Sequence, residues 1–271
     1  MKALSAPLAA LLSFPALALP GSAVAATGDS VPDRTLANPA ITESSGLARS
    51  TYRRPLLWTH NDSGDSARVF AVAASGATRA TLSLRCAKAY DWEDISSGPD
   101  HTLWVGDIGD NARARSTIQV YRFREPKSLA SGTVKCRRFT LAYPDGAHDA
   151  EALLVHPKTG RLWVVSKDAE GGTFYRAPST LSPAGTTMLT AVGPAPATVT
   201  AGSFAPGGRR LAVSSYTRAY MYRPDLTFVR EFPLRYQDKS ISGESLEYAR
   251  DGRHFFRGTE GTNSVVYRIA L

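Results

Sequence analysis

Short apolar runs alternate with polar turns along this chain from about residue 41 onward. Five units each open with a related three-residue phrase, followed by a turn with Gly, Pro or Arg between two apolar runs. The phrases are Ser45-Gly46-Leu47, Glu93-Asp94-Ile95, Glu151-Ala152-Leu153, Gly202-Ser203-Phe204 and Glu244-Ser245-Leu246. Their last residues lie roughly 40 to 60 positions apart, which is the period of β-propeller blades.

The apolar runs have the composition of β-strands. Turn residues bound them, β-branched and aromatic residues are frequent, and no stretch of ten or more residues keeps a helical period. The sequence therefore predicts an all-β fold, a propeller of five blades, with a β-sandwich as the alternative. Because the fifth unit has only three predicted strands, we expect a strand within Arg34 to Ile41 to close the ring.

The first 25 residues have the features of an export signal. Lys2 precedes an apolar stretch from Ala9 to Leu19, and Ala23-Val24-Ala25 resembles a cleavage site. An ordinary apolar helix is the alternative. Residues 26–40 are polar and contain proline, which predicts a linker or N-terminal arm before a single domain over 41–271. No later segment resembles a membrane span, so we expect a secreted, extracellular protein.

The net charge of +8 does not favour nucleic acid as the partner. A nucleic-acid surface requires a concentrated basic stripe with exposed aromatic residues. Here the excess is scattered, and much of it falls in pairs at turns or on outer strands. The pairs are Arg53-Arg54, Arg137-Arg138 and Arg209-Arg210. Such a surface suits weak, nonspecific attraction to anionic envelope polymers.

The two cysteines, Cys86 and Cys136, have two interpretations. In an exported protein a pair of cysteines more often forms a disulfide than a metal site. Cys86 precedes the inner strand of the second unit and Cys136 lies in its last strand, so a disulfide would join the last strand of that blade to the segment before its first strand. Two free buried thiols are the alternative.

Acidic side chains gather at one predicted face of the propeller. The starts of the inner strands and the loops between second and third strands lie on that face. The first group is Glu43, Asp91, Glu93, Asp94, His148, Asp149, Glu151 and Glu244, and the second is His60, Asn61, Asp62, Asp107, Asp110, Asn111, Lys167, Asp168 and Glu260. Carboxylates held close together repel one another unless a cation neutralises them.

This arrangement predicts a divalent cation near the propeller axis, with calcium as the tentative cofactor. Hard oxygen ligands suit Ca²⁺ or Mg²⁺, and calcium tolerates more geometries. Three glutamates occupy the same position of the repeated phrase, and two further acids lie nearby. The expected ligands are Glu93, Glu151, Glu244, Glu43 and Asp107. In the fourth unit Gly202-Ser203 replaces the acid, which argues against a symmetric cage.

Each acidic residue also has a purely structural interpretation. Asx side chains hydrogen-bond nearby backbone amides in turns, and carboxylates form ion pairs with the many arginines. Ion pairs to Lys167 or Arg113, for example, would close off the axial acids.

The sequence contains no common catalytic motif. Gly-x-Ser-x-Gly, a phosphate-binding Gly-Lys loop and His-Glu-x-x-His are absent. His60 and His148 are the candidate catalytic residues, as general bases beside a metal, and a hydrogen-bonded structural role is the alternative for each.

Four phrases resemble those of exported bacterial β-propeller proteins of the WD40-like, NHL-like and phytase-like group, mostly of unassigned activity. They are Glu43-Ser44-Ser45-Gly46-Leu47, Asp91-Trp92-Glu93-Asp94-Ile95, Gly106-Asp107-Ile108-Gly109-Asp110-Asn111 and Asp149-Ala150-Glu151-Ala152-Leu153. The resemblance covers the predicted mature chain. Calcium-dependent lactonases and phytases among propellers use axial Glu, Asp and Asn ligands, and Glu93, Glu151 and Glu244 match that arrangement in position.

Two functions follow as expectations. The first is a secreted binding or scaffold module in the cell envelope, whose partner at the acidic face is a small molecule, an envelope polymer or a protein. The second is a metal-dependent hydrolase of an ester, lactone or phosphate, which needs an open coordination position beside His60 or His148. The sequence does not decide whether the protein is an enzyme.

Overall fold

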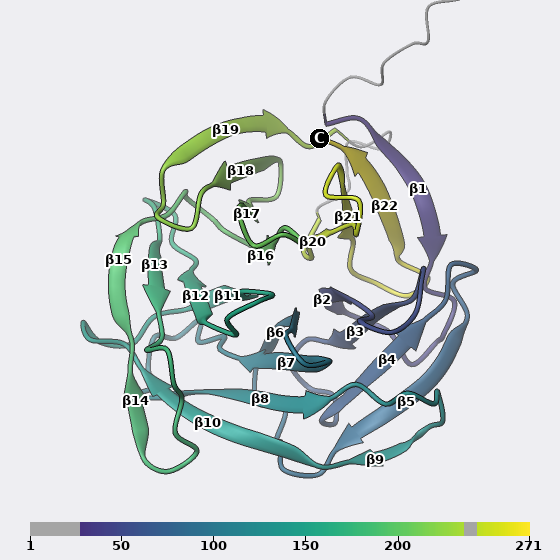
Figure 1. Ribbon diagram of the computed structural model, residues 1–271, viewed down its shortest axis with the longest axis horizontal. Helices are drawn as coiled ribbons and strands as arrows, with labels where there is room; N and C mark the ends of the chain where they lie inside the picture. Colours follow the sequence, from purple (N-terminus) through teal and green to yellow (C-terminus); the bar gives the residue numbers. More distant parts are fainter. Residues whose placement is uncertain (1–27, 236–242) are drawn as a thin grey trace, which may run out of the picture.

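The computed structural model describes residues 28–235 and 243–271. The predicted signal peptide, residues 1–25, lies outside these residues. The described chain forms five antiparallel sheets arranged as blades around a central axis (Figure 1), so the predicted five-bladed all-β propeller is confirmed. Nothing in the described ranges is a helix that could cross a membrane.

Each blade has four antiparallel strands, and the first of them lies nearest the axis (Figure 1). Blade 1 contains β2 (Ser44–Arg49), β3 (Leu57–Asn61), β4 (Arg68–Val72) and β5 (Thr78–Leu84); blade 2 contains β6 (Trp92–Gly98), β7 (Thr102–Asp107), β8 (Ile118–Arg124) and β10 (Cys136–Ala142). Blade 3 contains β11 (Ala150–Val155), β12 (Leu162–Ser166), β13 (Thr173–Arg176) and β15 (Thr190–Pro194). Blade 4 contains β16 (Ala201–Phe204), β17 (Leu211–Ser214), β18 (Arg218–Tyr222) and β19 (Phe228–Pro233). Blade 5 contains β20 (Glu247–Tyr248), β21 (His254–Gly258), β22 (Val265–Ala270) and β1 (Ser30–Thr35).

An N-terminal strand closes the ring, but it begins earlier than the sequence predicted. β1 pairs with β22 from Ser30 to Thr35, inside the segment interpreted as a linker or arm. Most of the predicted segment Arg34 to Ile41 is the loop after β1, from which Leu36 and Ile41 fill a core cluster. β1 itself buries the charged Arg34, whose guanidinium donates to the carbonyls of Pro55 and Val72.

Two short extra strands join neighbouring blades at the outer edge. β9 (Gly132–Val134) pairs in parallel with β5 of blade 1, and β14 (Thr186–Met188) pairs in parallel with β10 of blade 2. The predicted disulfide between Cys86 and Cys136 is present, and it joins the connection before β6 to β10. These links fix blades 1, 2 and 3 against one another.

Polar bonds between adjacent inner strands hold the axis together. The hydroxyl of Ser45 in β2 donates to the Glu93 carbonyl in β6 at 2.7 Å. The Asp94 carboxylate accepts from the backbone amide of Leu153 in β11 at 2.9 Å. Asp94 is almost fully buried, and desolvation raises its pKa well above the ordinary value. Side chains of the repeated phrases in blades 1 and 2 thus join each inner strand to the inner strand of the next blade.

Candidate functional site

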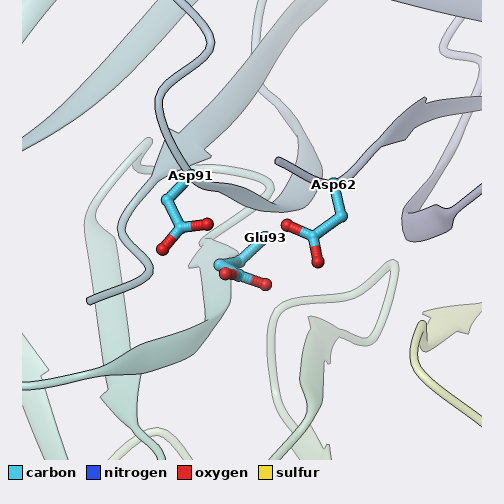
Figure 2. Close-up of side chains that lie close together, drawn as sticks. All are labelled: Asp62, Asp91 and Glu93. Atoms are coloured by element: carbon cyan, nitrogen blue, oxygen red, sulfur yellow. The ribbon is translucent and has the colours of Figure 1, made fainter. Parts of the chain in front are cut away.

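Three carboxylates converge at the mouth of the central channel, and we call Asp62, Asp91 and Glu93 the acidic cluster. One carboxylate oxygen from each residue lies within 4.8 Å of the corresponding oxygen of the other two. Figure 2 shows Glu93 between Asp91 and Asp62, with the three groups facing one another. Glu93 lies in β6, and Asp91 is the residue directly before that strand. Asp62 follows β3 of the neighbouring blade.

The backbone around Asp91 is fixed by Asp107, which lies at the end of β7. The Asp107 carboxylate accepts hydrogen bonds from the backbone amides of Tyr90 and Asp91, at 3.3 and 3.2 Å. It also forms an ion pair of 2.9 Å with Arg115. Because both of its oxygens are used in this way, Asp107 supports the loop beneath the cluster and does not point into it.

Gly109 provides the space in which two cluster carboxylates lie. The Gly109 amide donates to the Asp91 carbonyl at 3.2 Å, which places the loop after β7 directly against the cluster. A Cβ atom at Gly109 would overlap Glu93 Oε1 and lie 2.6 Å from Asp91 Oδ2. Because Gly109 has no side chain, it leaves room for the acidic cluster.

Burial and mutual repulsion raise the pKa values of all three cluster residues. Glu93 is only 4% exposed, and desolvation, followed by the charge of Glu151, raises its pKa well above the ordinary value. Burial and the charge of Asp62 raise the pKa of Asp91 to about 6. Burial also raises the pKa of Asp62. Within the described residues no ion pair neutralises any of the three.

Glu151 lies beside the cluster and forms an ion pair with a lysine. Lys167, from the loop between β12 and β13, approaches Glu151 Oε1 to 2.7 Å. Its ammonium also lies 5.5 Å from the centre of the Tyr216 ring. A hydrogen bond between the two carboxyl groups favours the proton on Glu93, because it raises the pKa of Glu93 and lowers that of Glu151. Burial raises the pKa of Glu151 as well, and Lys167 opposes that rise, whereas no basic partner opposes the rise at Glu93.

Two further glutamates extend the acidic surface toward blade 5. Burial, and then the charges of Glu260 and Glu151, raise the pKa of Glu244 to about 7. Burial and the charges of Asp62 and Glu43 raise the pKa of Glu260. The mouth therefore holds a continuous group of carboxylates whose ionisation costs free energy.

The sequence-predicted metal residues occupy different places in this arrangement. Glu93 belongs to the cluster, Glu151 pairs with Lys167, and Glu244 lies in the field of Glu151. Glu43 is exposed at the rim, where its carbonyl accepts from the Asp62 amide at 2.9 Å. The expected pairing of Lys167 with an axial acid is present, whereas Arg113 pairs with Asp168 at 3.1 Å.

The predicted bases, His60 and His148, have structural partners. His60 is fully buried in β3, donates from Nδ1 to the Asn61 carbonyl at 2.8 Å, and packs edge-on to Trp92. Desolvation lowers the pKa of His60 to about 4, so it is neutral at physiological pH. His148 Nε2 lies 3.1 Å from Asp145 and 2.9 Å from the Tyr175 hydroxyl. No hydrogen bond or ion pair in the described chain joins either ring to the acidic cluster.

Asp62 and Asp91 were both placed on the acidic face by the sequence, but not in the ligand set. Asp91 lies two positions before Glu93, and this spacing puts two strand residues on one face. No such spacing in the sequence relates Asp62 to Glu93. Its proximity to Glu93 results from the packing of blade 1 against blade 2.

The comparisons with known proteins support the fold. No protein-family model matches the chain, and no curated protein does. Among solved structures, the PQQ-bound aldose sugar dehydrogenase of Streptomyces coelicolor aligns with a TM-score of 0.52 and 11% identity, over 90% of this chain and 98% of that one. Two glucose dehydrogenase structures align with a TM-score of 0.53 and 9% identity, over 90% of this chain and 99% of theirs. At such low identity the similarity concerns the propeller fold alone.

Proposed function

We propose that this protein is a secreted binding module that holds a calcium ion in the acidic cluster and binds its partner through that ion. The observation that carries the proposal is the convergence of three carboxylates from two blades (Figure 2), none of which forms an ion pair with a basic side chain in the described part of the chain. Repulsion among buried carboxylates is relieved by a bound cation. The disulfide supports the extracellular assignment, because such bonds persist in oxidising compartments.

We propose calcium because it accepts irregular oxygen geometries, whereas Mg²⁺ demands near-ideal octahedral coordination. The three cluster oxygens lie within 4.8 Å of one another, close enough to share one ion. Calcium takes about six to eight oxygen ligands, so three carboxylates leave positions for water and for oxygens of a partner. A polymer or small molecule with carboxylate or hydroxyl groups has the required chemistry.

A binding role suits the site better than hydrolysis. A metal-dependent hydrolase needs a base beside the cation. His60 is buried with a pKa of about 4, and His148 is bonded to Asp145 and Tyr175.

Calcium should stabilise the folded protein. We expect residues 26–271, freed of metal with EDTA, to gain about 2.7 kcal/mol when free Ca²⁺ exceeds the dissociation constant 100-fold. For a chain of this size the melting temperature then rises by roughly 5 to 10 °C. Differential scanning fluorimetry across a calcium titration, with elemental analysis of the untreated protein, measures both effects. A melting temperature that is insensitive to calcium and EDTA, in a protein without bound metal, contradicts the proposal.

Gly109→Ala should weaken calcium binding at least about tenfold, which is a loss of about 1.4 kcal/mol. The added methyl group occupies the space of Glu93 Oε1 and forces that side chain to turn. Isothermal titration calorimetry with CaCl₂ measures the affinity. Gly132→Ala is the matched control, because no atom lies within 4 Å of a Cβ there. Equal calcium affinity in the two variants would show that the Gly109 space is irrelevant to the site.

A further inference from the structure

The face of the propeller opposite the acidic cluster carries a concentration of arginines. In the β2–β3 hairpin Ser44 pairs with Asn61 and Arg49 pairs with Leu57, so the two ends of the hairpin lie on opposite faces. Asp62 follows one end, and the turn with Arg53 and Arg54 forms the other. Five residues of strand separate the two faces by roughly 17 Å.

A cavity of about 310 Å³ lies between blades 1 and 5 on this second face. Its charged lining includes Arg49, Arg53, Arg54, Arg250 and Arg268. Its apolar lining includes Pro55, Leu56, Leu57, Ala249 and Phe256. This volume lies within the range of small-molecule sites, which combine an apolar wall with a few directed polar groups.

Part of the arginine charge in this cavity is neutralised within the protein. Arg49 pairs with the buried Glu247, and Arg268 lies 3.2 Å from Asp251. Glu247 does not itself line the cavity; the other acidic residue of the lining, Asp33, pairs with Arg34 at 2.7 Å. These pairs account for every carboxylate that lines the cavity.

Three arginines of the cavity, Arg53, Arg54 and Arg250, have no carboxylate partner among the described residues. The guanidinium of Arg53 donates to the Lys127 carbonyl, and that of Arg250 donates to the Ser50 carbonyl. Burial and the charges of Arg54 and Arg49 lower the pKa of Arg250, and the more weakly acting charges of Glu125 and Glu247 oppose this shift. The arginines repel one another, and an anion between them would relieve that repulsion.

A second hollow continues the cavity along blade 1. It shares Arg53, Arg54, Pro55 and Leu56 with the first, and it adds Arg79 and Leu129. Arg79 is exposed and belongs to no ion pair of the described chain. The two hollows together form what we call the arginine groove.

We propose that the arginine groove binds an organic phosphate or sulfate monoester, with the oxyanion at Arg53, Arg54 and Arg250 and the apolar group against Leu56 and Phe256. Guanidinium groups bind tetrahedral oxyanions through paired, charge-assisted hydrogen bonds. The apolar wall distinguishes an organic ester from the inorganic ion. This site lies on the opposite face from the acidic cluster and does not depend on the calcium proposal.

Phenyl phosphate and phenyl sulfate are suitable probes, titrated calorimetrically in EDTA at about 0.15 M salt, where long-range attraction between exposed charges is largely screened. We expect saturable binding of at least one ester, about tenfold tighter than that of inorganic phosphate or sulfate. Comparison of the two esters identifies the preferred oxyanion. Absence of saturable binding by both esters, or equal binding of ester and inorganic ion, overturns the proposal.

Arg54→Gln tests the location of this binding. Arg54 is exposed and forms no hydrogen bond or ion pair within the described chain, so the variant should keep its melting temperature. We expect ester affinity to fall about tenfold, and Arg54→Lys to give an intermediate loss because lysine keeps the charge without the planar fork. Arg209→Gln is the matched control, since Arg209 is exposed in the equivalent turn of blade 4. Unchanged ester affinity in Arg54→Gln would place the binding elsewhere.

Discussion

The combined variant Asp62→Asn, Asp91→Asn and Glu93→Gln should lose the calcium-dependent rise in melting temperature completely. These substitutions keep the size of each side chain and remove the three negative charges that converge at the channel mouth. Amide oxygens are neutral, and calcium sites lose affinity as the number of charged ligands falls. The expected loss is the whole calcium effect, roughly 5 to 10 °C at saturation.

The same variant should be more stable than the natural protein in EDTA. Desolvation and mutual repulsion oppose the ionisation of the three carboxyl groups in the folded state. Neutral amides remove that cost, so calcium dependence and stability without metal change in opposite directions. A substitution that merely damages the fold would lower the melting temperature under both conditions.

Glu231→Gln is the control for this experiment. Glu231 lies on β19, where it forms an exposed ion pair of 2.6 Å with Arg218. Exposed pairs contribute about 0 to 1 kcal/mol, so this variant should melt near the natural temperature and keep the full calcium response. Persistence of that response in the combined variant would exclude the acidic cluster as the calcium site.

The number of blades was predictable because it depends on local pattern. The repeated phrase and the turns are set by strand alternation and turn chemistry, which act over a few residues. A closing N-terminal strand was predicted, but its position was not, because the pairing of β1 with β22 uses backbone atoms and its buried residues are Ser30 and Arg34, not apolar side chains. β9 and β14 have three residues each and no alternation, so only their neighbours define them as strands.

The candidate site was predictable in location but not in membership. Equivalent positions of the repeat bring Glu93, Glu151 and Glu244 to one channel, as their mutual effects on pKa show. Which acids share a cation depends on tertiary contacts that no local pattern encodes. Lys167 reaches Glu151 from a separate loop, and Asp107 is turned away by Arg115.

The melting temperature of the metal-free protein should fall as the pH rises from about 6 to 7. Burial and neighbouring charges raise the pKa of Glu244 from its ordinary value of 4.5 to about 7. Burial and the charge of Glu151 also raise the pKa of Glu93. A carboxyl group with a raised pKa binds more protons when folded than when unfolded, so stability decreases as pH rises between the two pKa values.

The buried His60 has the opposite effect, but in a lower pH range. Its pKa is lowered from 6.5 to about 4, so unfolding takes up a proton and stability rises with pH only between these values. Above about pH 6.5 this contribution is complete, and the slope is set by carboxyl groups with raised pKa values, which include Asp94 and Glu247 as well as those at the channel mouth. Asp65 and Asp251 have lowered pKa values and contribute only below pH 4.

Calcium should remove the part of this pH dependence that comes from the acidic cluster, because the ion requires the ionised carboxylates. Calcium competes with protons for these groups, so its affinity should rise about tenfold per displaced proton for each pH unit below the relevant pKa, and this gain offsets the loss of stability of the metal-free protein. Thermal melts from pH 5.5 to 8.5, in EDTA and in saturating calcium, measure both slopes. Glu244→Gln should reduce the fall in EDTA and leave the calcium response. A metal-free melting temperature that climbs steadily through this range would mean that the mouth carboxylates are not held under repulsion, and the reason for a cation there would disappear.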